Sequence, residues 1–447
     1  MGKFDQIPIN EITFEPASRF DDVGRLFHWN GRVYRAIRPG SADFYRDLFN
    51  NRIIQSLFDN GLVRSRIVPL ALDGYDLVLQ HDRIPFISYS LEWGSEMLRD
   101  AALLICDLNS QIFTEGLVLK DVRSWNILFD PNRPVFVDWG AISPIRELKE
   151  WPYMLFRHKF IWPLYLMSAG VFRIARISML DDLNSLRLGD IFRLLLKRVP
   201  WTTLVRYWLT DWKCKQDRFR LDNNFFQSLR RSIESIPLKE ERTTWTGYDQ
   251  SYRSLSFHPS DDWPPKVRNV YKLLKSICPE TVTDIGCNRG WFSELAALQG
   301  ARVIAIDMDE PSINSLYSRS RAKELSILPL VMDICAPTPD HGPLHVCSAA
   351  QKRMQGELVL ALAITHHMVF KRAWKFDVIA AQLSAFTRQW LIVEYIPPDD
   401  YWVSKLMSER FAWYNLDNFI NALRVFFKRI EVFESSPSPR LLLFCER

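Results

Sequence analysis

The stretch that most constrains the fold of this chain is TDIGCNRGWFSELAALQGARVIAIDMDE, residues 283–310. An apolar approach leads to Asp284 and then to a turn that contains Gly286 and Gly290. A helix-forming segment follows, and a second apolar run ends at Asp307. Buried strands that alternate with helices are typical of parallel sheets, whose ligands bind beyond the carboxyl ends of the strands. The run therefore predicts a strand, a glycine turn, a helix and a second strand that ends in an acid.

The residue types in this run suit an adenosine-bearing cofactor. Glycines let the backbone turn sharply and approach a ligand where a Cβ would obstruct it, and a carboxylate at Asp307 can accept both hydroxyls of a ribose. The spacing differs from the G-x-G-x-x-G turn that holds a dinucleotide pyrophosphate, because only Gly286 and Gly290 are present and Asp284 precedes them. The plainer alternative is a Rossmann-like unit without a cofactor.

The pattern D-x-G-x-x-x-G, followed by a strand that ends in an acid, resembles the first and second motifs of the class I S-adenosylmethionine (SAM)-dependent methyltransferases. In that family the acidic glycine loop faces the methionine part of SAM. The resemblance implies a set of cofactor-binding residues in the C-terminal half: Asp284, Gly286, Cys287, Asn288, Gly290, Asp307, Met308, Asp333 and Ala363. Asp333 stands where the family often places an acid near the adenine amine.

Further apolar runs complete the expected sheet. We predict a preceding helix over residues 267–276, strands over 328–333, 358–364 and 390–394, and a terminal antiparallel hairpin over 430–434 and 440–445. This order is that of the α/β Rossmann-like class I methyltransferase fold.

Two histidines follow the expected fourth strand of this sheet. His366 and His367 fall beyond its carboxyl end, where ligands bind in such folds. Because an imidazole titrates near neutral pH, either one can take a proton from an acceptor hydroxyl during methyl transfer. The alternative is that the pair only packs the loop or shapes the pocket. Glu394, at the end of the next strand, is a weaker candidate for orienting a histidine or the acceptor.

The N-terminal half begins with a different pattern. Asn30-Gly31 lies between two alternating runs and predicts a β-hairpin with a type I′ turn. A helix over residues 42–60, strands over 66–70 and 75–80, and a long helix over 95–115 are expected next. This is the order of a kinase-type small lobe that leads into a large lobe.

Asp121 and Asn126 then occur at the spacing D-x-x-x-x-N, and an apolar strand delivers Asp138 in an Asp-Trp-Gly turn. These segments resemble the catalytic and metal-binding loops of the protein-kinase-like superfamily. The resemblance implies Asp121 as the base, and Asn126 and Asp138 as ligands of Mg²⁺ on ATP. The chain departs from the family pattern, since Leu119-Lys120 replaces His-Arg, no glycine-rich loop or helix glutamate is evident, and Arg35 or Arg38 must replace the strand lysine.

We therefore expect an α+β kinase-like bilobal domain over residues 1–238, a linker over 239–262 and the methyltransferase domain over 263–447. Before the methyltransferase core, Trp245, Tyr248 and Tyr252 are expected either to pack within the linker or to form a lid over the cofactor.

The composition and the residue patterns argue against several other classes of protein. A net charge of +5 from 57 basic and 52 acidic residues gives no clear nucleic-acid signature. Seven scattered cysteines without a C-x-x-C pair predict reduced thiols and a cytoplasmic protein. The start of the chain lacks the apolar core of a signal peptide, and the most apolar stretch, residues 160–172, is too short to cross a bilayer. Contact of the protein with a membrane surface is kept as an alternative.

The predicted function is SAM-dependent O-methylation of a glycan, small-molecule or phosphate acceptor. An active kinase-like domain would phosphorylate the same acceptor, whereas a silent one would bind the acceptor or a partner. A purely non-enzymatic interaction protein is disfavoured by the complete glycine-turn motif. The fused arrangement resembles nodulation-associated methyltransferases and bacterial enzymes that modify glycans.

Overall fold

The computed structural model describes residues 5–148, 150–180, 188–217, 221–238, 243, 252, 254–342 and 346–447. The chain forms two compact units. The N-terminal unit comprises residues 1–91 and 95–239 with the short segment 342–347, and the C-terminal unit comprises the rest. No helix among the described residues is long and apolar enough to span a membrane.

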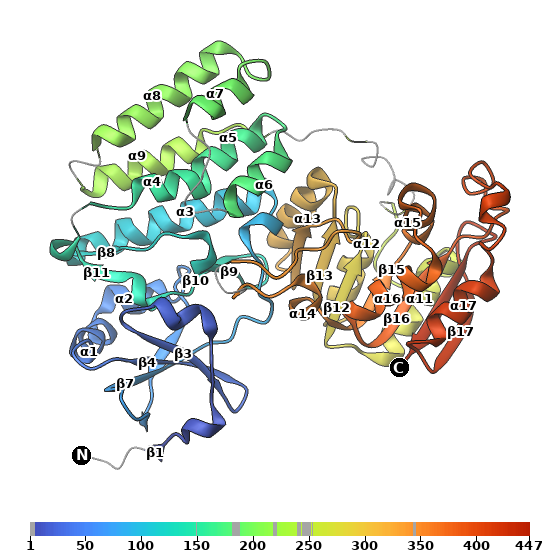
Figure 1. Ribbon diagram of the computed structural model, residues 1–447, viewed down its shortest axis with the longest axis horizontal. Coiled ribbons are helices and arrows are strands. Elements are labelled where there is room, and N and C mark those ends of the chain that lie inside the picture. Colours follow the sequence, from blue (N-terminus) through green and yellow to red (C-terminus); the bar gives the residue numbers. More distant parts are fainter. Residues whose placement is uncertain are drawn as a thin grey trace. The chain divides into compact units, whose positions relative to one another are not determined.

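The N-terminal unit contains a five-stranded antiparallel sheet in the order β2-β3-β4-β7-β5 (Figure 1). The predicted hairpin is present, since β3 and β4 pair from Gly24 with Ile37 to Trp29 with Arg32, and Asn30 and Gly31 have positive φ angles in its turn. The strands of this unit up to β7 are β1 (Asp5–Gln6), β2 (Thr13–Phe14), β3 (Gly24–Trp29), β4 (Arg32–Ile37), β5 (Ser65–Ile67), β6 (Leu70–Ala71) and β7 (Leu77–His81).

The prediction of one continuous helix over residues 42–60 is wrong. The segment forms two helices, α1 (Ala42–Asn50) and α2 (Arg52–Leu57). Asn51 has an extended backbone, and its side chain accepts hydrogen bonds from the amides of Ile53 and Ile54. An asparagine that caps a helix in this way also interrupts the preceding one, because its backbone leaves the helical region.

After the long helix α3 (Ser95–Ile112), two short antiparallel pairs carry the polar motif of the N-terminal unit. β8 (Leu117–Leu119) pairs with β11 (Ile142–Pro144), and β9 (Ile127–Phe129) pairs with β10 (Pro134–Phe136). The loops after β8 and β10 bear Asp121 and Asp138. The remainder is helical: α4 (Tyr153–Phe156), α5 (Trp162–Ser168), α6 (Phe172–Leu180), α7 (Leu188–Leu195), α8 (Trp201–Asp217) and α9 (Asn223–Glu234).

The C-terminal unit is built on a seven-stranded sheet in the order β14-β13-β12-β15-β16-β18-β17 (Figure 1). The first five strands of that order are parallel, whereas β18 runs antiparallel between β16 and β17. This is the strand order of the class I methyltransferases. The strands are β12 (Thr281–Ile285), β13 (Arg302–Asp307), β14 (Ile327–Val331), β15 (Gly356–Ala361), β16 (Thr387–Tyr395), β17 (Arg429–Glu434) and β18 (Leu441–Glu446).

Helices cover this sheet because its parallel strands are apolar on both faces. On one face, α11 (Pro265–Ile277), α12 (Trp291–Leu298) and α13 (Glu310–Ala322) contribute Val270, Leu295 and Leu316 to one core with residues of β12, β13 and β15. Among the described residues of this unit, the other α-helices are α14 (Ala350–Arg353), α15 (Thr365–Arg372), α16 (Phe376–Phe386) and α17 (Leu416–Arg424). Helices α16 and α17 contact each other, α16 also contacts β16, and α17 contacts β17.

Candidate active site

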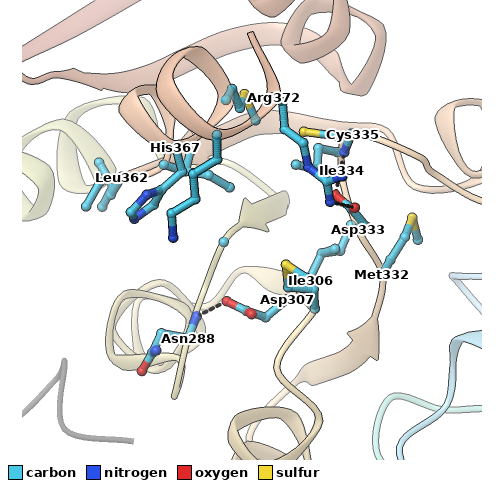
Figure 2. Close-up of a pocket in the computed structure, with 16 residues that line it drawn as sticks. Asn288, Ile306, Asp307, Met332, Asp333, Ile334, Cys335, Leu362, His367 and Arg372 are labelled. Carbon is cyan, nitrogen blue, oxygen red and sulfur yellow. Dashed lines mark hydrogen bonds and ion pairs between the residues drawn. The ribbon is translucent and has the colours of Figure 1, made fainter. Parts of the chain in front are cut away.

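A cavity of about 400 Å³ opens at the carboxyl ends of the parallel strands in the C-terminal unit. Its volume lies within the range of pockets that hold small molecules and cofactors. Figure 2 shows Asn288 and Asp307 on one side, His367 and Leu362 on a second, and Asp333 and Arg372 on a third. Seven residues proposed from the sequence line this cavity: Gly286, Asn288, Asp307, Met308, Asp333, Ala363 and His367.

The glycine turn forms one wall of the cavity and is tied to the end of β13. The Asn288 backbone amide donates a hydrogen bond to Asp307 Oδ2 at 2.7 Å (Figure 2). The Asp309 backbone amide donates to Oδ1 at 2.8 Å. Burial raises the pKa of Asp307 to about 6, against the opposing effect of these amides. Gly286 has φ of +74°, and a Cβ there would lie 2.7 Å from the side chain of Ile364. The turn thus requires glycine both for its conformation and for space.

Three residues of the predicted cofactor set do not line the cavity among the described residues: Asp284, Cys287 and Gly290. Asp284 is buried behind the turn, where Ser293 Oγ donates to its carboxylate at 2.6 Å and burial raises its pKa to about 7. Gly290 has φ of +78° at the start of α12 and lies against Leu316. These residues shape the turn from beneath.

The two histidines occupy the first turn of α15, and only His367 lines the cavity. Their rings are in contact at a tilt of 39°, with centroids 3.9 Å apart. Burial, together with nearby cations, lowers the pKa of His366 to about 3 and that of His367 to about 4. Both imidazoles are therefore neutral at physiological pH, in the form that can accept a proton.

Several cavity residues were not identified from the sequence. Arg372 donates to Asp333 in an ion pair, and the Cys335 amide donates to the other carboxylate oxygen of Asp333 at 2.9 Å (Figure 2). The set missed by sequence reasoning is Ile306, Met332, Ile334, Cys335, Leu362, Ile364, Met368, Lys371 and Arg372. Apart from Met368 on α15, the apolar members lie at or just beyond the ends of β13, β14 and β15, so the position of each strand end was the available signal.

Glu394 does not orient a histidine, as the sequence had suggested, because it is fully buried and already engaged. Lys266 Nζ lies 2.8 Å from its Oε2, and Ser435 donates to its other oxygen. Glu394 therefore joins α11 to the β17–β18 connection.

Aromatic residues before α11 pack on this core. Tyr252 contacts Trp291 and Phe292, with ring centroids 5.9 Å and 5.5 Å apart. Trp245 and Tyr248 lie outside the described residues.

In the N-terminal unit, Arg35 on β4 is buried and joins two acids. Its guanidinium pairs with Asp21 and, at 2.9 Å, with Asp138 Oδ1. These carboxylates outweigh the cost of burial and raise the pKa of Arg35. Burial raises the pKa of Asp138, with Asp21 and Asp121 adding to the rise and Arg35 opposing it. Asp121 therefore lies near this cluster, and Asn126 Nδ2 donates weakly to its carbonyl oxygen at 3.4 Å. Asp21 was not identified from the sequence.

Comparisons with known proteins give a relative for nearly the whole chain. This chain is 27% identical over 439 residues to the nodulation protein NoeA of Rhizobium meliloti (strain 1021), with 90% of each chain covered. No protein-family model matches the chain.

Two solved structures illustrate the structural neighbours. The bifunctional kinase-methyltransferase WbdD is 20% identical with a TM-score of 0.28, over 40% of this chain and 38% of that one. This chain thus spans about two fifths of WbdD. Magnesium protoporphyrin IX methyltransferase (ChlM) from Synechocystis PCC 6803, solved with bound S-adenosylhomocysteine (SAH), is 14% identical with a TM-score of 0.31, over 45% of this chain and 94% of that one.

The predicted resemblance to nodulation-associated proteins is confirmed by the NoeA comparison. The C-terminal unit has the class I methyltransferase strand order. Together these findings support the predicted SAM-dependent methyltransferase.

Proposed function

We propose that the C-terminal unit binds SAM in the cavity beyond β12, β13 and β15 and transfers its methyl group to an oxygen of a glycan, small-molecule or phosphate acceptor. The observation that carries the proposal is the joining of Asp307 and the glycine turn in one cavity wall, with His367 on another. When bound, SAM supplies an electrophilic methyl group. Asp307 would accept the ribose hydroxyls, and Asp333 would lie on the adenine side.

A neutral histidine suits this transfer electrostatically. SAM held by the glycine turn and Asp307 would supply a methyl group carried on a sulfonium, and the positive charge of the sulfonium would be lost on transfer to the acceptor oxygen. The acceptor proton can pass at that point to His367, so one positive charge replaces another in the same cavity. Burial, with Lys371 and Arg440 nearby, lowers the pKa of His367 to about 4, so its imidazole is in the neutral form that can accept this proton.

Replacing Asp307 with alanine is expected to weaken SAM binding at least about tenfold. The change removes the charged acceptor for two hydroxyls, each hydrogen bond being worth about 1.5–3 kcal/mol. Calorimetric titration of the full chain with SAM measures the effect. Asp377→Ala, on the first turn of α16 and away from the cavity lining, is the control. If the dissociation constant for SAM were unchanged in Asp307→Ala, Asp307 would not belong to the SAM-binding site.

A second candidate function belongs to the N-terminal unit, which we propose binds Mg-ATP with slow or absent phosphoryl transfer. The supporting observation is the Arg35–Asp138 pair, which puts a cation beside the acid proposed as a metal ligand. Asn126 would supply the second ligand and Asp121 the base. Arg35 would contact nucleotide phosphate, but its rigid fork does not reproduce the point charge of a lysine. A silent module that binds the acceptor or a partner is the alternative.

We expect ATP to raise the melting temperature of the full chain only when Mg²⁺ is present, and we expect this shift to disappear in Asp138→Ala. The reason is that the metal joins the carboxylate to the phosphates. Differential scanning fluorimetry with ATP, with and without Mg²⁺, checks the expectation, and Asp130→Ala in the neighbouring β9–β10 turn is the control. If ATP with Mg²⁺ did not shift the melting temperature of the wild-type protein, the N-terminal unit would serve only as a scaffold.

A further inference from the structure

Helix α8 of the N-terminal unit, labelled in Figure 1, carries exposed tryptophans on one side. Trp201, Trp208 and Trp212 are 65%, 46% and 47% exposed. They are seven and four residues apart, so they follow one line along a helix that has 3.6 residues per turn. At 1.5 Å of rise per residue, this tryptophan stripe is about 16 Å long. Leu209 is exposed beside it.

The other side of α8 holds the helix to the rest of the N-terminal unit. Leu204, Tyr207 and Cys214 are buried there. Asp211 is also buried, and Arg157 Nη1 lies 2.8 Å from its carboxylate. The helix is therefore fixed by its inner face, and the tryptophan stripe lies on the surface although large apolar rings are costly to leave in water.

Basic side chains accompany the stripe. Arg206 and Lys213 are exposed on α8, and Lys197 and Arg198 are exposed just before it. From residue 188 to residue 217 the sequence has six basic residues and three acids, and one of these acids is the buried Asp211. The segment that forms α7 and α8 therefore carries an excess of positive charge.

Tryptophan rings beside lysine and arginine suit the surface of an anionic membrane. An indole has an apolar body and a polar N–H, so it is stable at the level of the lipid headgroups. Lysine and arginine near such a surface are attracted by the negative charge of the lipids. A second copy of this chain fits less well, because a twofold contact would bring the same cations of two chains together.

We infer that the tryptophan stripe, together with Arg206 and Lys213, docks the N-terminal unit on the surface of a membrane that contains anionic lipids. Helix α8 lies parallel to that surface, with its indole rings among the headgroups and its basic side chains at the lipid phosphates. This contact is separate from the proposed methyl transfer and does not depend on it.

The test mixes the full chain with vesicles of phosphatidylcholine, either alone or with phosphatidylglycerol, and measures the bound fraction by flotation. We expect binding to the vesicles that contain phosphatidylglycerol, and we expect it to weaken as salt rises, because salt screens the attraction. Replacing two rings, in Trp201→Gln with Trp212→Gln, should lower the partition coefficient about tenfold or more, since their apolar surface no longer leaves water. Trp402→Gln is the matched control, because Trp402 is 61% exposed but belongs to the C-terminal unit.

A second variant tests the charges. Arg206→Gln with Lys213→Gln should also weaken binding about tenfold or more and should reduce its dependence on salt, because two cations near the lipids are lost. All the replaced side chains are exposed, so each variant should keep the melting temperature of the wild-type protein.

Other results would overturn the inference. Absence of binding to vesicles that contain phosphatidylglycerol would mean that the stripe does not dock on such a membrane. Equal binding of the wild type and the tryptophan variant, or an equal loss in Trp402→Gln, would place the contact elsewhere. Equal binding to the two kinds of vesicle would remove Arg206 and Lys213 from the site. If the stripe mediated dimerisation or bound a single-stranded oligonucleotide, without binding vesicles, it would belong to that partner instead.

Discussion

Replacing Lys266 with methionine is expected to lower the free energy of unfolding of the C-terminal unit by about 3–5 kcal/mol. The change leaves the carboxylate of Glu394 buried without its counter-charge, since the two side chains are 3% and 0% exposed and lie 2.8 Å apart. Removing one partner of a buried pair costs far more than the pair contributes, because the remaining charge stays desolvated. Denaturant unfolding followed by tryptophan fluorescence measures the loss, and the transition of this unit is the one that SAH shifts.

Two further variants separate the buried charge from other causes. Lys266→Met combined with Glu394→Leu should recover most of the loss, because no unpaired charge remains. Lys352→Met removes an ion pair with Asp340 whose side chains are 67% and 39% exposed, and it should change stability by less than about 1 kcal/mol. A Lys266→Met protein as stable as the Lys352→Met protein would contradict the explanation.

Turnover of the methyl-transfer reaction is expected to fall by about 10²–10⁴-fold in His367→Ala, with the SAH dissociation constant unchanged. The reason is that His367 lines the cavity in its neutral form and can receive the acceptor proton. The measurement is the rate of SAH formation with saturating SAM in the presence of a glycan, small-molecule or phosphate-bearing acceptor.

His366 and an exposed histidine provide the comparison. His366 does not line the cavity, so His366→Ala should slow turnover less than His367→Ala. His258→Ala, at an exposed position of the same unit, should have no effect. Wild-type rates in both the His366 and the His367 variants would assign the pair to packing alone.

Local patterns in the sequence predicted much of the fold. Asn30-Gly31 specified its hairpin because few residues tolerate positive φ angles at both central positions. The apolar run before Asp307 specified a buried parallel strand and the place where it ends. The same strand ends brought Asp307, Asp333 and His367 to one cavity, since parallel strands end at one edge of the sheet.

Side-chain pairings between distant residues were not predictable in this way. Lys266 and Glu394 are 128 residues apart, and Arg372 and Asp333 are 39 apart, so no local pattern connects them. The break at Asn51 was missed for a different reason, because the apolar stripe continues through it while the capping side chain ends one helix and begins another. Cys335 lies in the loop after β14, and Lys371 lies on α15 after β15. The path that each segment takes beyond its strand brings the residue to the cavity.

The position of β18 has a consequence for biosynthesis. This strand pairs with both β16 and β17, yet it follows both of them in the chain. A nascent chain made only as far as β17 would leave β16 with an unpaired edge and β17 with no neighbour in the sheet. Such an edge readily recruits other strands. Completion of this sheet must therefore wait until residues 441–446 have left the ribosome, and the unfinished sheet is the stage at which chaperones would protect the chain from aggregation.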